Sequence, residues 1–428
     1  MTQSHLPRLL LLFSSLSMVT ACGSSKNSNS HTLTLKVVSK TDESPFYTRL
    51  ATESSRVLIT DSNASPQSGV NLDLPEGHEL FVVELDRADA PKLASELFRE
   101  ERLVLFTARD EREAFIISSK ASEFAHPRKV KTADLKQPSA ISTPTDLTAL
   151  ATTIPGIQGI SIDAQRMRED LEALSGARPI VVDGQSYTLA NRATADNKTK
   201  ARAWLKASYE ALGFTVIEHR YSSGVNLIAE KKSANPADDQ VFMVSGHMDT
   251  VQTAGADDDG SGTISSLTIA RALASLNLKR AIRFVAFDEE ERGLIGSEAY
   301  AKELNRTGEI SKVSLLNIEM TGYDSDNDGD FHTIDCNENS SPAISQALMT
   351  AISSEGLALK KVEACTNRSD HAVFWEYNRP AIVISQNFFG GDSNPCYHRT
   401  CDTVQKMNWE YMEKLTRAAA NAVFNLNR

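Results

Sequence analysis

The sequence predicts an α/β protein: a mostly parallel, mixed sheet with helices on both faces, preceded by a small α/β N-terminal domain. From residue 160 to residue 428, short apolar runs alternate with segments of helical periodicity. Such alternation is typical of a largely parallel sheet with helices packed against each face. Residues 126–159 are rich in Pro, Thr, Ser and Ala, a composition that indicates a linker between the two domains.

The large domain, residues 160–428, has a separate signal for each element. Apolar runs predict strands at 225–229, 241–244, 282–287, 313–318 and 381–384. Helical periodicity predicts helices at 261–276, 297–304, 341–355 and 409–424. Two earlier helices have recognisable ends. One begins with Ser161 or Asp163 as its cap and stops at Gly176, and the other stops at Gly213.

The small domain, residues 32–125, is expected to combine strands with a helix. Residues 80–85 and 103–106 predict strands. Residues 90–100 predict a helix that carries Leu93, Leu97 and Phe98 on one face. The position of this domain ahead of a linker is compatible with two roles. It is either a prodomain that shields the site or assists folding, or a permanent spacer.

The N-terminus has the features of an export signal at residues 1–21. Arg8 precedes an apolar run at 9–13, and small residues lead to Cys22. This ending resembles the lipobox of bacterial lipoproteins, which implies cleavage before Cys22 and lipid on its sulfur. The apolar run is too short for a stable membrane span. The alternative is a plain secretory signal with an incidental cysteine. Residues 22–31 would then be a flexible tether.

These features predict an exported lipoprotein of the cell envelope, held at the membrane by the lipid on Cys22 and released if the linker is cut. The cysteine count supports export. The chain has 5 Cys, and lipidation of Cys22 leaves an even set for disulfide bonds in an oxidising compartment. Three pairings of that set are open, and the most local one joins Cys336 to Cys365 and Cys396 to Cys401.

The charge of the chain argues against a nucleic-acid partner. The formal net charge is −11 and the pI is near 5.4, so nucleic-acid phosphates would be repelled. Charged residues make up 24% and hydrophobic residues 41% of the chain, which is ordinary for a globular protein.

Histidines and carboxylates follow the predicted strands of the large domain. His247, Glu290, Glu291 and Glu319 come just after strands, His398 lies in the loop after the strand at 381–384, and Asp258 lies in a Gly-rich segment before a helix. Because the carboxyl ends of strands form the sites of open α/β sheets, we expect these side chains to meet. Two imidazoles and three carboxylates are a suitable donor set for a pair of zinc-like ions. A further carboxylate can accept a proton from an activated water.

The same segments resemble the zinc aminopeptidases of the M28 family, most closely the secreted bacterial, leucyl-type enzymes. The resemblance covers residues 160–428, and the matching motifs in chain order are GHMD, GADDDGSG, EEERGLIGS, an acidic residue before MTGY, and CYH before CDT. It implies a peptidase with two Zn²⁺ per chain. Such an enzyme hydrolyses the N-terminal bond of peptides with a free N-terminus, through a metal-bound hydroxide and a Glu general base.

The resemblance also implies a role for each matched ligand. Asp258 would bridge the two ions, since one carboxylate has two oxygens. His247 and Glu319 would complete one site. Glu291 and His398 would complete the other, which leaves each ion room for a shared water.

Three further residues are predicted to take part in catalysis. Asp249, two positions after His247, can accept a hydrogen bond from the second ring nitrogen and fix the tautomer. Glu290 would be the general base. Tyr397 matches a tyrosine that stabilises the tetrahedral intermediate in some family members.

Two features depart from a simple match. Glu319 stands where the family usually has Asp, and it remains a competent oxygen ligand with a longer reach. Residues 369–371 read Ser-Asp-His and match a common family segment. Because these residues are sequence neighbours they cannot form a serine triad, and we expect them to lie near the site as structural residues.

A second cation site is suggested by residues 324–329. Asp324, Asp326 and Asp328 alternate ahead of a glycine, and Asp335 lies eleven positions after the first. This spacing resembles a Ca²⁺-binding loop, whose last position is normally Glu. The alternative is an acidic turn without an ion.

Four other functions are alternatives to the aminopeptidase. A glutaminyl cyclase shares the fold but uses one zinc. A carboxypeptidase would need a basic site for the terminal carboxylate, which the sequence does not reveal. A non-enzymatic envelope binding protein would have lost ligands, and a serine hydrolase would need a Gly-x-Ser-x-Gly elbow. The preferred side chain of the substrate is left open, with Met320, Phe388 and Phe389 as candidates for the pocket.

Overall fold

The computed structural model describes residues 159–235, 237–336 and 342–428 of the large domain. In the N-terminal part it describes residues 32–38, 48–51, 56–61, 70–73, 78–84, 92–100, 103–109, 114, 117–118 and 128–129. The predicted signal peptide, Cys22 and the tether to residue 31 lie outside the described residues. So does the predicted linker, apart from residues 128–129 and 159.

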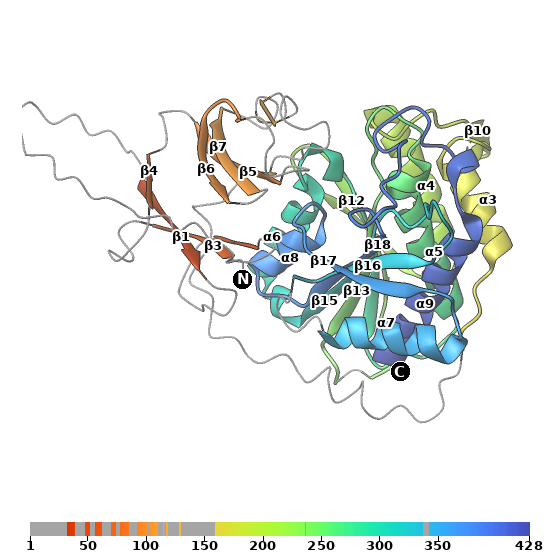
Figure 1. Ribbon diagram of the computed structural model, residues 1–428. Coiled ribbons are helices and arrows are strands. Elements are labelled where there is room, and N and C mark those ends of the chain that lie inside the picture. The colour runs from red at the N-terminus through yellow and green to blue at the C-terminus, as the bar shows by residue number, and fades with distance from the viewer. Residues whose placement is uncertain are drawn as a thin grey trace, which may run out of the picture.

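An eight-stranded mixed sheet forms the centre of the large domain, in the order β11-β12-β14-β13-β15-β18-β16-β17 (Figure 1). Its strands are β11 (Thr215–Arg220), β12 (Val225–Lys231), β13 (Val241–His247), β14 (Ala281–Phe287), β15 (Val313–Ile318), β16 (Asp330–Ile334), β17 (Lys360–Ala364) and β18 (Ala381–Gln386). The central strands β14, β13, β15 and β18 are parallel, and β12 and β16 join them in antiparallel fashion. All the strands predicted for this domain are therefore present.

Helices cover both faces of this sheet, as predicted. Phe242 and Val244 of β13 pack in one core with helices α3, α4, α5, α7 and α9, whereas Val241 and Met243 pack in the other with α6 and α8. Strands buried on both faces read as continuous apolar runs, which is why they were recognisable. The helices are α3 (Ala164–Leu174), α4 (Ala195–Ala211), α5 (Gly262–Leu273), α6 (Ile295–Thr307), α7 (Pro342–Glu355), α8 (His371–Glu376) and α9 (Trp409–Asn427).

The ends of the first two helices follow the predicted signals. The Asp163 side chain accepts the backbone N–H of Arg166 at 2.9 Å and so caps α3. Gly176 and Gly213, which follow α3 and α4, have φ values of 78° and 85°. These are left-handed conformations that favour glycine after a helix. Between the helices lies a hairpin of β9 (Ile180–Val182) and β10 (Gln185–Tyr187).

The described N-terminal part contains two four-stranded sheets, β2-β3-β1-β4 and β6-β7-β5-β8, and β8 lies in the segment predicted to be a linker. Their strands are β1 (Thr32–Val38), β2 (Thr48–Ala51), β3 (Arg56–Asp61), β4 (Val70–Asp73), β5 (Glu79–Glu84), β6 (Glu96–Glu100), β7 (Leu103–Ala108) and β8 (Arg128–Lys129). The strands predicted at 80–85 and 103–106 are confirmed as β5 and β7. Strand β2 lies beside α8 of the large domain.

The helix predicted at residues 90–100 is wrong. The Glu96 side chain accepts the backbone N–H of Leu93 at 2.9 Å, and residues 96–100 form β6, which pairs with β7. The spacing of Leu93, Leu97 and Phe98 fits a helical face, but pairing with the neighbouring strand supplies the backbone hydrogen bonds instead. Tertiary context thus overrides a local pattern here.

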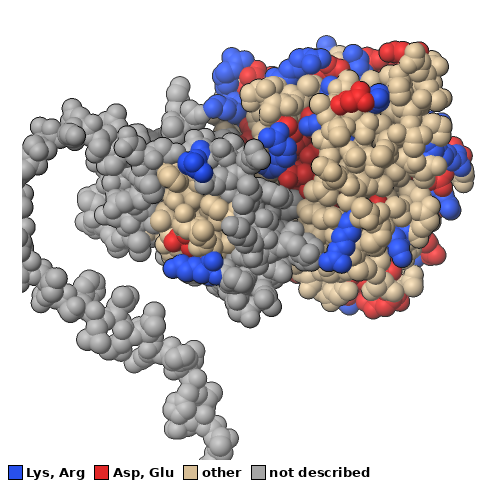
Figure 2. Space-filling view, turned by 90° about the horizontal axis from the view of Figure 1, so that it is seen from above, with Lys and Arg blue, Asp and Glu red and all other residues tan. Residues whose placement is uncertain are grey.

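Both disulfides of the most local pairing are present. The S–S distances are 2.10 Å for Cys336–Cys365 and 2.14 Å for Cys396–Cys401. No helix of the described residues is both long enough and apolar enough to cross a membrane. On the face drawn in Figure 2, Lys and Arg side chains are interspersed with Asp and Glu.

Candidate metal centre

The predicted ligands meet at the carboxyl ends of the parallel strands. His247 is the last residue of β13, and Glu319 directly follows β15. Glu290 and Glu291 lie in the single turn η2 (Glu290–Arg292), shortly after β14. Because β14 and β15 flank β13 on opposite sides, this end of β13 is a topological switch point, where open α/β sheets form their sites.

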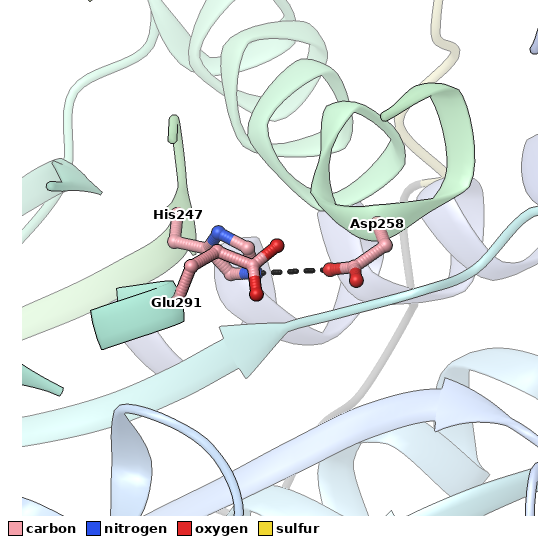
Figure 3. A group of neighbouring side chains, drawn as sticks. All are labelled: His247, Asp258 and Glu291. Atoms are coloured by element: carbon pink, nitrogen blue, oxygen red, sulfur yellow. Dashed lines mark ion pairs between the residues drawn. The ribbon is translucent and has the colours of Figure 1, made fainter. Parts of the chain in front are cut away.

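The carboxylate of Asp258 lies between the two histidines. It belongs to the segment η1 (Ala256–Ser261), which leads into α5. Its Oδ1 is 3.2 Å from His247 Nε2, and its Oδ2 is 3.0 Å from His398 Nε2. In Figure 3, His247 and Glu291 point toward Asp258 from neighbouring segments. One carboxylate therefore faces two imidazoles, one with each oxygen.

The remaining carboxylates lie either beside His398 or beside His247. Glu291 Oε2 is 3.0 Å from His398 Nε2. Glu290 and Glu319 lie on the other side, where each offers an oxygen within 4.8 Å of His247 and of one another. Asp258 and Glu291 form a second such group with His247. The structure thus brings all the ligands predicted from the sequence into one cluster, with Glu290 beside them.

Asp249 holds the ring of His247 and the turn that carries the two glutamates. Its Oδ1 is 3.4 Å from His247 Nδ1, and its backbone oxygen is 3.2 Å from the same nitrogen. Its carboxylate oxygens also accept the backbone N–H groups of Glu290 and Glu291, at 3.2 and 3.3 Å. This second function was not predicted from the sequence.

The longer side chain of Glu319 is held by hydrogen bonds. The Ser369 hydroxyl donates to Glu319 Oε2, and Asn317 Nδ2 donates to the same oxygen at 3.3 Å. Asn317 also donates to Ser369 Oγ at 2.7 Å. The Ser-Asp-His segment therefore lies beside the centre, as expected. Its histidine, His371, contacts the backbone oxygen of Thr366 through Nε2.

Two aromatic side chains, Tyr397 and Phe388, lie next to His398. The ring of Tyr397 stacks on His398 with centroids 3.9 Å apart, and Phe388 meets Tyr397 edge-on at 5.4 Å. Tyr397 is buried, whereas Phe389 is exposed. The Cys396–Cys401 disulfide encloses Tyr397 and His398.

Burial and like charges shift the titration of the cluster. Burial raises the pKa of Glu319 to about 8 and that of Asp370 to about 7. Although burial acts in the opposite direction, the two imidazoles beside its oxygens hold the pKa of Asp258 below its usual range. Burial lowers the pKa of His398, but the negative charges of Glu291 and Asp258 and the contacts with both carboxylates together outweigh burial, and the pKa rises to about 10. So many buried carboxylates need positive charge beside them.

The residues present fit a divalent metal. Within the described part of the chain, His247 Nε2 and Glu291 Oε2 are buried and form no hydrogen bond. Buried polar atoms without a hydrogen bond are uncommon, because they lose their hydration without compensation. Imidazole nitrogens and carboxylate oxygens are ordinary zinc ligands. The two oxygens of Asp258 each face one histidine.

Arg192 is a positioning residue that sequence analysis missed. Its side chain is fully buried and donates to the backbone oxygens of Met248 at 2.7 Å, Ala254 at 2.8 Å and Gly255 at 2.9 Å. It therefore shapes the loop between His247 and Asp258. No local sequence pattern identifies Arg192, because these three partners lie more than fifty positions away.

Asp259 connects three parts of the centre. Its Oδ2 accepts the backbone N–H of His247, and its Oδ1 accepts those of Gly262 and Met320, each at 3.0 Å. The close approach needs a glycine at position 262, where a Cβ would lie 2.0 Å from the backbone oxygen of Ile318. The three consecutive aspartates were visible in the sequence, but their separate roles depend on this packing.

Part of the large domain matches a known family. Residues 226–423 match the family model described as Peptidase family M28. The large domain, called the M28 domain below, is similar to this family over these residues. The matched region includes every ligand candidate from His247 to His398.

One curated relative with sequence similarity to the M28 domain is leucine aminopeptidase 2 of Trichophyton rubrum. It is 32% identical to this chain over an alignment of 221 residues, with 46% of this chain and 44% of that protein covered. The chain spans about half the length of the curated relatives it matches.

Two solved structures show the same fold as the M28 domain. The LapA aminopeptidase of Legionella pneumophila has a TM-score of 0.61 at 19% identity, covering 82% of this chain and 99% of that chain. A glutaminyl cyclase of Bacteroides thetaiotaomicron, bound to N-acetylhistamine, has a TM-score of 0.53 at 16% identity, covering 63% and 99%. At these identities the likeness concerns the fold alone.

Proposed function

We propose that this chain is a dinuclear zinc aminopeptidase that removes N-terminal residues from peptides. The observation that carries the proposal is the Asp258 carboxylate, whose two oxygens face His247 Nε2 at 3.2 Å and His398 Nε2 at 3.0 Å. The match of residues 226–423 to the M28 family model supports it. So does sequence similarity to a protein named leucine aminopeptidase 2.

In this proposal each ion has three ligands from the chain. His247, Asp258 and Glu319 would hold one ion. Asp258, Glu291 and His398 would hold the other. When bound, such a metal pair supplies Lewis-acid activation of the scissile carbonyl and of the attacking water. The chain itself holds its ligands in place through Asp249, Asp259 and Arg192.

Glu290 is the proposed general base. It is buried, its Oε2 is 3.8 Å from His247 Nε2, and its backbone N–H is fixed by Asp249. Burial raises the pKa of Glu290 well above its ordinary value, against the opposing charge of His247. A carboxylate of raised pKa suits proton transfer near neutral pH. Glu290 would take the proton of the water and deliver it to the leaving amine.

Tyr397 is the proposed donor to the oxyanion of the tetrahedral intermediate. Burial raises the pKa of its phenol well above the ordinary value, and the charge of Asp258 acts in the same direction. The hydroxyl therefore keeps its proton at neutral pH and can donate it in a hydrogen bond. Stacking on His398 fixes the ring. The removal of such a donor costs about 10²–10³ in kcat.

The alternatives differ in substrate, so an assay with matched substrates separates them. Purified, zinc-loaded protein would be given one peptide in four forms: free at both ends, N-acetylated, C-terminally amidated, and with an N-terminal Gln. We expect cleavage of the free and amidated forms and no cleavage of the acetylated form. Cleavage of the acetylated form but not of the amidated form would instead indicate a carboxypeptidase. Conversion of the Gln peptide to pyroglutamate without hydrolysis would indicate a glutaminyl cyclase.

The export signal and the role of the small domain also remain proposals. We propose that the chain is anchored through Cys22 and that residues 32–125 act as either a prodomain or a spacer. Limited proteolysis between residues 126 and 159 distinguishes the two roles. A prodomain predicts a gain in peptidase rate once the fragments are separated. An unchanged rate leaves the spacer.

A further inference from the structure

A second group of carboxylates lies outside the candidate metal centre. Asp324, Asp326 and Asp328 occupy the loop between β15 and β16, and Asp392 follows β18. One oxygen from each lies within 4.8 Å of the others. Asp335, the last position of the loop pattern in the sequence, is not part of this group. The fourth member comes instead from a distant loop.

One oxygen of this group is buried without a hydrogen bond. The Asp324 side chain is 9% exposed, and its Oδ2 accepts the backbone N–H of Gly329 at 3.3 Å. Its Oδ1 is buried and has no hydrogen-bond partner among the described residues. A buried carboxylate oxygen without a donor is destabilising unless a cation lies beside it.

Asp392 is also buried and is fixed in place. Its exposed fraction is 2%, and its Oδ1 accepts the backbone N–H of Ser325 at 2.7 Å and the Ser325 hydroxyl at 2.6 Å. Within the residues that the structure describes, no Lys or Arg forms an ion pair with any of the four aspartates. No ion pair among these residues therefore neutralises the negative charge of the group, although Lys360, which pairs with Asp330, also acts electrostatically on Asp328.

We propose that these four aspartates bind one Ca²⁺ ion, which fastens the loop after Glu319 to the loop that leads to His398. The group offers only oxygen donors, which Ca²⁺ prefers. Zinc sites ordinarily include nitrogen or sulfur ligands. The site does not depend on the proposed peptidase activity.

Contacts of the same two loops reach the metal centre. Asn394, two positions after Asp392, donates from Nδ2 to Asp257 Oδ2 at 2.7 Å. The backbone N–H of Gly322, two positions before Asp324, donates to Asp257 Oδ1 at 2.9 Å. Asp257 is the neighbour of the bridging Asp258. A cation that joins the two loops would therefore stabilise the backbone that presents Asp258.

The site is tested by binding of Tb³⁺ and its displacement by Ca²⁺ on the purified, zinc-loaded protein. Tyr411 lies close enough to sensitise Tb³⁺ emission, since its hydroxyl donates to the backbone oxygen of Asp330. We expect Tb³⁺ emission that Ca²⁺ removes with a Kd on the order of 10⁻⁴–10⁻³ M, as in extracellular Ca²⁺ modules. The melting temperature should rise over the same Ca²⁺ range.

Matched variants locate the site. Asp326→Asn with Asp328→Asn keeps the side-chain shape of two exposed positions and should weaken Ca²⁺ binding about tenfold or more, since affinity follows ligand charge. Asp335→Asn should leave binding unchanged, and the zinc content of all variants should be unchanged. The proposal is overturned if Ca²⁺ at 10 mM neither displaces Tb³⁺ nor raises the melting temperature. It is also overturned if Asp335→Asn weakens binding as much as the double variant.

Discussion

The Asp402 carboxylate accepts the backbone N–H of Asp258 at 3.1 Å, although the two residues are 144 positions apart. Its other oxygen accepts the N–H of Asp257 at 2.9 Å. Asp402 directly follows the Cys396–Cys401 disulfide, which encloses His398. The loop that presents one candidate ligand is therefore fixed to the loop that presents the bridging carboxylate.

Loss of Asp402 should weaken the metal centre and the fold together. Asp402→Ala leaves two buried N–H groups without acceptors, which costs about 1–3 kcal/mol for each group. Asp402→Asn keeps one acceptor oxygen, so its effect should be smaller. Zinc content after dialysis and the melting temperature measure both effects. Asp196→Ala, at an exposed position of α4, is the control. Full zinc retention by Asp402→Ala would refute this role.

Substitutions of the adjacent Glu290 and Glu291 should have different effects. Glu290→Gln removes the proposed base but no proposed ligand, so it should keep zinc and lose about 10²–10⁴ in kcat. Glu291→Gln should lower zinc content, since its Oε2 lies 3.0 Å from His398 Nε2. Zinc analysis alongside peptidase kinetics checks both variants. If Glu290→Gln loses zinc while Glu291→Gln retains it, the assignment is reversed.

The two disulfides should differ in what their loss changes. The short Cys396–Cys401 loop contributes about 2 kcal/mol in the chain-entropy model, and the longer Cys336–Cys365 loop about 3.6 kcal/mol. Replacing both cysteines of a pair by Ser should lower the melting temperature more for Cys336–Cys365. Activity should fall more for the other pair, because it encloses Tyr397 and His398. A variant without Cys396–Cys401 that keeps full kcat would contradict this expectation.

Metal removal should make stability depend on pH. Burial raises the pKa of Glu319 to about 8 and of Asp370 to about 7, against about 4 in the unfolded chain. A raised carboxyl pKa gives stability that is present below the unfolded value and is lost as pH rises through the folded value. The melting temperature of the metal-free protein should therefore fall between about pH 5 and pH 8.5.

Bound zinc supplies the positive charge that protons supply in the metal-free protein. The melting temperature of the zinc-loaded protein should therefore change less over the same pH range, and the difference between the two forms should grow with pH. Differential scanning fluorimetry of both forms measures this. A metal-free protein whose melting temperature is constant or rises with pH would contradict the sign of the argument.

The central strands were predictable because burial on both faces leaves an unbroken apolar run, as in β13. Strands β16 and β17 were not identified, since Asp330–Ile334 and Lys360–Ala364 mix charged and apolar residues. Strands of this mixed composition are defined by pairing with their neighbours in the sheet. The same reason explains why residues 96–100 form a strand where the local pattern indicated a helix.

The ligand candidates were predictable because each follows a strand and has a donor suited to zinc. Asp249 was identified next to His247, but its hydrogen bonds to η2 were not. Arg192 and Asp402 act on backbone groups more than fifty positions away. Such long-range contacts produce no motif of fixed spacing in the sequence, so only the folded structure reveals them.

The number of zinc ions tests the central claim most directly. The claim is that the two oxygens of Asp258 serve two different ions, because each faces its own histidine. The measurement is elemental analysis of purified protein saturated with zinc in excess Ca²⁺, which keeps zinc out of the aspartate group. The account predicts two zinc ions per chain. A single zinc ion per chain at saturation would contradict it.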